Sequence, residues 1–115
     1  MTAFRILLVV LWTIIVVYTG IVIANHGWGL LPIFFADMAA MGWPGQFNLD
    51  FSSLLALSAL WVAWRHQFSG GGVALGLLAF FGGGLFLTAY LFVVSAQAKG
   101  DMKEVLLGKA RATGT

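Results

Sequence analysis

Two carboxylates, Asp37 and Asp50, lie in the proline- and glycine-containing segment that separates the first two long apolar runs. An ionisable side chain at membrane depth is costly, so it often marks a proton or cation site, or a contact with a partner's arginine. Capping is the plainer alternative: Asp50, like Asn48, can cap the next helix, and Asp37 can cap a short helix starting at Met38. We therefore treat Asp37 and Asp50 as a candidate ionisable site.

The two histidines, His26 and His66, are candidate cofactor ligands. A membrane haem b is commonly held by two imidazoles at one depth. Three spans place these histidines at opposite membrane faces, whereas four spans bring them to the same side. A headgroup-level histidine is the simpler interpretation, so we predict no cofactor and keep haem or chlorin ligation as the alternative.

Catalytic motifs are missing from the sequence. The chain has no cysteine, and its glycine-rich runs at 69–72 and 80–84 lack the lysine of a phosphate-binding loop. Nucleophile–base pairs and metal-binding clusters are also absent from the sequence pattern. Six Lys/Arg against four Asp/Glu, without a basic cluster, do not indicate nucleic-acid binding. The sequence therefore predicts neither an enzyme nor a nucleic-acid partner.

Composition places these residues in a membrane. The chain is 61% hydrophobic and 15% aromatic, but only 9% charged. A soluble surface usually needs about a quarter of charged residues. We therefore expect an integral membrane protein with the lipid bilayer as its first partner.

Three apolar runs are long enough to cross a hydrocarbon layer of roughly 30 Å. They predict spans at about 4–24, 49–66 and 72–97. The first run exceeds the apolar core of a secretory signal, so we expect an uncleaved span. The predicted fold is all-α: a membrane bundle over residues 1–98, followed by a polar C-terminal tail over 99–115. Four tryptophans are expected to lie at the headgroup level as interface anchors: Trp28, Trp43, Trp61 and Trp64.

The stretch over residues 30–47 allows two topologies. As a fourth span it would leave five Lys/Arg inside and one outside, whereas three spans leave two inside and four outside. However, Pro32 and Pro44 confine any helix to about eleven residues, and Asp37 would lie on its most apolar face. We therefore predict a short interfacial or re-entrant helix between the first and second spans, with four spans as the alternative.

Small residues recur along the second and third spans at intervals of three and four. Helices in lipid associate by close van der Waals approach, so these stripes predict a packing seam, either between the two spans or in a homodimer. The general abundance of Gly and Ala in membrane helices is the competing explanation. Adjacent glycines at 82–84 also predict a kink or a close approach rather than a cofactor. The stripes consist of Ser52, Ala56, Ala59, Ala63, Gly72, Gly76, Ala79 and Gly83.

The pattern resembles a family of small, uncharacterised three-span bacterial inner-membrane proteins, a domain of unknown function. The resemblance rests on "LLPIFFADMAAMGWPGQFNLDF", "LSALWVAWRHQFSGGG" and the glycine-rich last span, and it covers residues 30–94. It implies three spans with a short external helix in a multi-pass protein of the bacterial inner membrane. It implies no activity and no functional residues.

These features favour a non-enzymatic accessory or assembly subunit of a larger membrane complex, for example one of electron transfer or photosynthesis. Its expected partners are other integral membrane subunits or further copies of itself. A small homo-oligomeric proton- or cation-coupled transporter or channel that uses Asp37 is one alternative. A haem- or pigment-binding membrane protein is the other.

Overall fold

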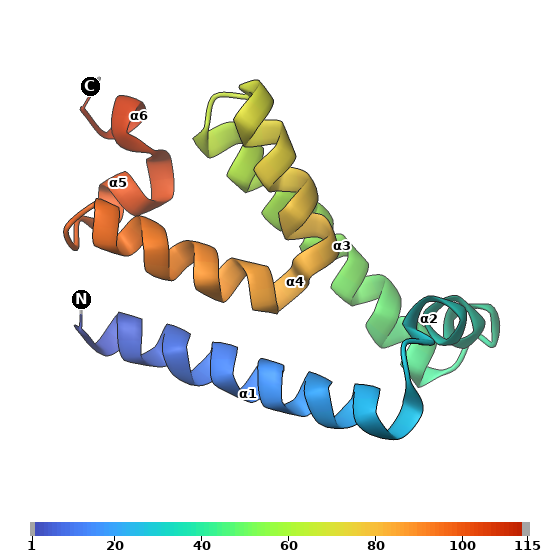
Figure 1. Cartoon of the computed structure of the whole chain (residues 1–115). Helices are drawn as coiled ribbons and strands as arrows, with labels where there is room; N and C mark the ends of the chain where they lie inside the picture. Colours follow the sequence, from blue (N-terminus) through green and yellow to red (C-terminus); the bar gives the residue numbers. More distant parts are fainter. Residues whose placement is uncertain (1, 114–115) are drawn as a thin grey trace.

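Helices make up the regular structure of the computed structural model, which describes residues 2–113 (Figure 1). Three helices, α1, α3 and α4, are long and apolar enough to cross a membrane, and the shorter α2 lies between the first two. The predicted all-α fold is thus confirmed. The helices are α1 (Thr2–His26), α2 (Leu30–Ala39), α3 (Trp43–Arg65), α4 (Gly70–Gln97), α5 (Met102–Leu107) and α6 (Lys109–Thr113).

The first two helices meet at a sharp turn. α1 exposes almost all of its apolar surface, and Leu8 is its one buried residue among those described. Gly27 follows it with a φ of 74°, a left-handed conformation that suits glycine. Pro32 falls within the first turn of α2, where its missing N–H would have no helical partner in any case.

Helix α3 begins at Trp43, six residues before the expected start at about 49. Pro44 occupies its first turn, so this proline starts a helix rather than separating two. Gly45 is buried where α2 crosses, since a Cβ at this position would lie 2.8 Å from the Cα of Met38. Because Asp50 lies inside α3 and Asp37 inside α2, the proposed capping roles of both carboxylates are wrong.

Helix α4 is broken near its middle. Ser69 caps its start by accepting a hydrogen bond from the backbone N–H of Gly72 at 3.1 Å. At Gly83 the backbone leaves the helical region, with φ 55° and ψ −139°, a combination that is essentially restricted to glycine. The predicted kink is therefore present, and the two halves, 70–82 and 84–97, run in different directions (Figure 1).

Each half of α4 packs on a different long helix. The first half lies along α3, and the second half lies along α1, while α1 and α3 share no extended contact (Figure 1). Arg5 joins α1 to the end of α4 by donating from Nη2 to the carbonyl oxygen of Ser95 at 3.0 Å. Nearer the break, Ile15 of α1 packs against Gly84. The fold is thus two helix pairs joined at Gly83.

The C-terminal segment packs against the bundle instead of standing apart from it. Val105 of α5 is fully buried in the core. The indole N–H of Trp61 donates to the carbonyl oxygen of Leu106 at 2.9 Å, which fixes α5 against α3. The buried core cluster consists of Val62, Ala79, Tyr90, Val94, Ala98 and Val105.

Candidate functional site

A polar network joins α3, α4 and α5 at one end of the molecule. Arg65 donates from Nε to the carbonyl oxygen of Val105 at 2.6 Å and from Nη2 to that of Glu104 at 3.2 Å. Its Nη1 donates to the Tyr90 hydroxyl at 3.2 Å, and this hydroxyl lies 2.6 Å from Nε2 of His66. Three elements that are distant in sequence therefore share one hydrogen-bonded cluster.

Aromatic side chains contact the ring of Tyr90, whereas its hydroxyl contacts the charged Arg65. Phe86 stacks on the Tyr90 ring at 5.6 Å, and Trp61 meets it edge-on at 6.0 Å. Burial lowers the pKa of His66 below its ordinary value of 6.5, and the positive charge of Arg65 lowers it further. A neutral imidazole can accept a hydrogen bond from Tyr90, so the network is compatible with the lowered pKa.

An open polar cavity of about 670 Å³ lies beside this network. It is lined mainly by the ends of α3 and α4 and by the tail, including Arg65, His66, Lys99, Glu104 and Lys109. The guanidinium of Arg65 uses its donors on protein acceptors rather than pointing free into the cavity. The cluster therefore acts as a structural junction.

All six Lys/Arg residues of the sequence lie at this same end, at the start of α1, the ends of α3 and α4, and the tail (Figure 1). The fold-back of α4 produces this arrangement, because it returns the chain to the end from which α4 began. Neither topology considered from the sequence has this distribution. The cationic residues are Arg5, Arg65, Lys99, Lys103, Lys109 and Arg111.

The small-residue stripes meet over part of their length. A Cβ on Gly76 would lie 2.9 Å from the carbonyl oxygen of Ala59 and 3.4 Å from the Cβ of Ala63. Likewise, a Cβ on Gly72 would lie 3.4 Å from the Ala63 carbonyl oxygen, and Ala79 is fully buried. The first half of α4 thus approaches α3 closely, as helices packed through small residues do.

The other end of the seam differs from the prediction. Ala56 is exposed, and Ser52 donates to the carbonyl oxygen of Asn48 within its own helix. Gly83 instead approaches larger side chains, because a Cβ there would lie 3.1 Å from Cζ of Phe51 and 3.4 Å from a methyl of Leu55. Since α4 turns away at Gly83, the bulky side chains fill the space that opens between the helices.

The four predicted anchor tryptophans divide into two kinds. Trp28 and Trp43 are 84% and 74% exposed at the end opposite the polar network, and their position at the headgroup level stays a prediction. Trp61 and Trp64 instead hold the tail: Trp61 through its N–H, and Trp64 by stacking under the Arg111 guanidinium at 4.0 Å from the ring centroid. This second role depends on the folded tail, and no pattern in the sequence predicts it.

The two carboxylates are not brought together with a cation. Asp37 is partly buried within α2, and Asp50 is exposed on α3, two helical turns after Trp43. α3 is 23 residues long, or about 35 Å, which is enough to cross a hydrocarbon layer of roughly 30 Å. Asp50 lies about 10 Å along this helix from Trp43.

The histidines are widely separated. His26 ends α1 and is exposed, whereas His66 follows α3 within the polar network at the other end of the molecule (Figure 1). One chain therefore does not place both imidazoles on one haem. Within residues 2–113, no three His, Asp or Glu side chains gather closely enough to hold a metal ion.

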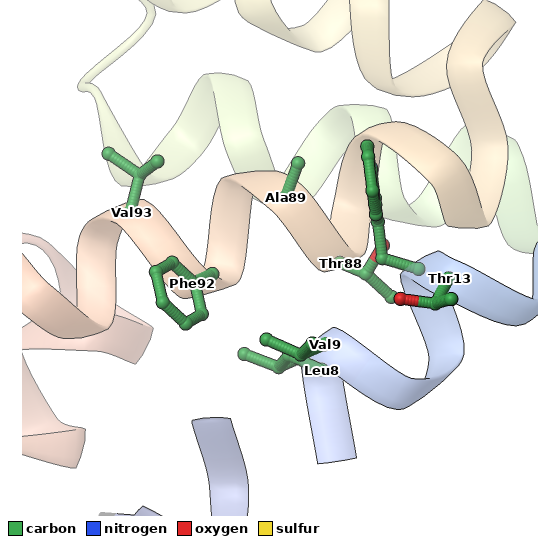
Figure 2. Close-up of a pocket in the computed structure, with 8 residues that line it drawn as sticks. Leu8, Val9, Thr13, Thr88, Ala89, Phe92 and Val93 are labelled. Carbon is green, nitrogen blue, oxygen red and sulfur yellow. The ribbon is translucent and has the colours of Figure 1, made fainter. Parts of the chain in front are cut away.

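An apolar groove of about 330 Å³ runs between α1 and the second half of α4 (Figure 2). Leu8 and Val9 lie on one side of it, and Phe92 and Val93 lie on the other. The hydroxyl of Thr88, which also lines the groove, donates to the carbonyl oxygen of Gly84 at 2.8 Å in its own helix. None of the lining residues is charged, so the groove is suited to apolar contact.

The cluster membership of Arg65 and Tyr90 was not predicted from the sequence. The available signal was a tyrosine within an otherwise apolar span, since a buried phenol usually finds a hydrogen-bond partner. Comparison with protein-family models, with curated proteins and with solved structures finds no match to this chain. The resemblance to a small inner-membrane family stays a prediction.

Proposed function

We propose that this protein is a non-enzymatic small subunit or assembly factor of a larger membrane complex. The break in α4 is the observation that supports this function. Gly83 lies opposite Phe51 and Leu55, in the central part of α3, so the break falls inside the hydrocarbon layer that α3 spans.

Backbone groups at such a break lose their helical hydrogen-bond partners, and lipid cannot replace them. Non-helical backbone at membrane depth persists where protein covers it or where it lines a water-filled cavity. α1 and α3 cover the break from two sides, but the neighbouring Phe81 is 81% exposed and Leu78 is 56% exposed. Helices of another subunit would complete this cover.

The charge distribution supports an orientation in a bacterial inner membrane. Cytoplasmic ends of membrane helices are enriched in Lys and Arg. Because all six of these residues lie at one end, we place that end, with the start of α1 and with α5 and α6, in the cytoplasm. In this orientation α1 and α3 cross the membrane, while α4 enters from the cytoplasmic side, turns at Gly83 and returns.

Photo-crosslinking in native membranes tests the proposal. A photoreactive amino acid at Phe81 should form a discrete adduct with another membrane protein. The same photoreactive residue at Ile14, which is 58% exposed on α1, provides the matched control and should give mainly lipid adducts. Absorbance of the isolated complex would then reveal whether it carries haem or chlorin.

Two outcomes would count against the accessory function. Lipid adducts alone at Phe81 would show that no protein covers the break. A band at twice the mass of the chain would favour the homo-oligomer.

A further inference from the structure

Asp50 differs from the polar residues around it on α3. The side chains of Asn48, Ser52 and Ser53 each donate to a backbone carbonyl oxygen at 2.8–3.1 Å, so their polarity is satisfied within the protein. In the part of the chain that the structure describes, the Asp50 carboxylate has no hydrogen bond and no ion pair. Ionisable groups within membrane spans almost always pair with another group or face a water-filled cavity, and the described part of this chain supplies no pair for Asp50.

Asp50 also occupies the centre of a regular exposed stripe. Successive members are separated by four, three, four and three residues, which is the spacing of a seam between two packed helices. The apolar members are between 59% and 74% exposed, so this chain leaves the seam uncovered. We call this surface the Asp50 stripe; it consists of Trp43, Phe47, Asp50, Leu54 and Leu57.

Charge identifies the kind of helix that fits the stripe. All six Lys/Arg residues lie at the end of the molecule opposite Trp43, and both histidines lie at helix ends. A second copy in the same orientation would therefore present no lysine or arginine at the depth of Asp50. A different chain with a basic residue inside its span would present one.

We propose that the Asp50 stripe is the docking face for one transmembrane helix of another subunit, which carries a lysine or arginine opposite Asp50. This inference rests on the proposed function and specifies the chemistry of the partner. The apolar residues of the stripe pack against the incoming helix, while the ion pair fixes its depth and rotation.

Crosslinking on the stripe provides the first test. A photoreactive amino acid at Leu54 in native membranes should give an adduct with a different membrane protein. Asp50→Asn should reduce this adduct at least tenfold, whereas Asp50→Glu should retain it. Asp37→Asn, which removes the other membrane-region carboxylate, is the matched control and should leave the adduct unchanged. Size-exclusion profiles and thermal unfolding in detergent verify that each variant is folded.

A defined probe provides the second test without knowledge of the natural partner. A polyleucine transmembrane helix with one arginine, placed about 10 Å from the non-cytoplasmic end, is co-expressed with the full chain. It should crosslink to Leu54 at least tenfold more than an all-leucine helix. Asp50→Asn should abolish this difference.

Four outcomes would overturn the inference: a self-adduct at Leu54, lipid adducts alone, an adduct insensitive to Asp50→Asn, or equal capture of the two polyleucine helices. Uptake of protons or cations by proteoliposomes of the pure protein, if lost in Asp50→Asn, would also overturn it by making Asp50 an ion site. A protein adduct at Phe81 without one at Leu54 rejects this inference alone. Lipid adducts alone at both positions reject the proposed function as well.

Discussion

The hydroxyl of Tyr90 lies 2.6 Å from Nε2 of His66, and this contact joins the second half of α4 to the end of α3. The two residues are 24 positions apart in sequence. In a continuous α4, Tyr90 would lie far along the helix from the 66–69 turn. The contact therefore depends on the break at Gly83.

Tyr90→Phe should weaken the fold-back of α4. It removes the hydroxyl that contacts both His66 and Arg65, and a typical hydrogen bond contributes about 1 kcal/mol to stability. We expect a loss of about that size in the free energy of unfolding, measured by denaturant titration in detergent. Tyr18→Phe is the control, because Tyr18 is 70% exposed; an equal loss there would contradict the interpretation.

Acidification should destabilise the same junction through His66. Its pKa in the folded protein is below 6.5, so the unfolded state binds more protons as the pH falls through that value. The stabilisation of the folded state that a neutral His66 provides is complete above about pH 6.5 and is lost progressively below it. Thermal unfolding at pH 7.5 and 5.5 measures the effect. His66→Gln should show a smaller drop between these pH values than the wild type, and an identical drop would refute the prediction.

Gly83→Ala distinguishes a broken helix from a continuous one. At φ 55° and ψ −139° an alanine is strained, at a cost of about 1–3 kcal/mol. In a continuous helix the same change would stabilise the protein by about 1 kcal/mol. Denaturant titration therefore gives opposite signs for the two structures. Gly71→Ala, with open space around its Cβ, is the control for glycine replacement in α4.

Gly76→Val should separate the first half of α4 from α3. The Cβ alone would lie 2.9 Å from the carbonyl oxygen of Ala59, and overpacking typically costs about 1–3 kcal/mol. The free energy of unfolding should fall accordingly. Gly20→Val meets no neighbouring atom within 4 Å, so it should have little effect. Tolerance of Gly76→Val would mean that this contact does not hold the helices together.

Cysteine labelling tests the orientation, and the chain contains no native cysteine to interfere. In intact cells, an impermeant maleimide should label Met41→Cys. Gln67→Cys and Met102→Cys should react only after lysis, because both ends of α4 are cytoplasmic in our topology. If α4 crosses the membrane completely, Gln67→Cys and Met102→Cys will label from opposite sides.

The long helices were largely predictable from sequence, because the length of each apolar run determines them. The third run predicted a start at about residue 72, two residues after the observed start of α4. The caps were not predictable in the same way, since neither Asp37 nor Asp50 caps a helix. Pro44 was ambiguous, since a proline can either interrupt a helix or occupy its first turn, and α3 consequently begins earlier than expected. The packing of Gly45 against α2 distinguishes these two alternatives. A local sequence pattern carries no information about that tertiary contact.

Tertiary relationships were less accessible. Adjacent glycines indicated a weak point in α4, but they did not specify that the chain would turn back there. The charge count favoured a fourth span, but neither of the two topologies that it compared allowed α4 to turn back at Gly83. Contacts such as Arg65 with the carbonyl oxygen of Val105 join residues 40 positions apart, and backbone acceptors have no residue-type signature.

The bonds from Arg65 to the tail also impose an order on biosynthesis. The carbonyl groups of Glu104 and Val105 that receive the Arg65 guanidinium are translated 39 and 40 residues after it. Until these groups have left the ribosome, Arg65 must stay hydrated or bound to lipid phosphate. A nascent chain arrested before Glu104 would therefore hold an intermediate in which this end of the fold is open.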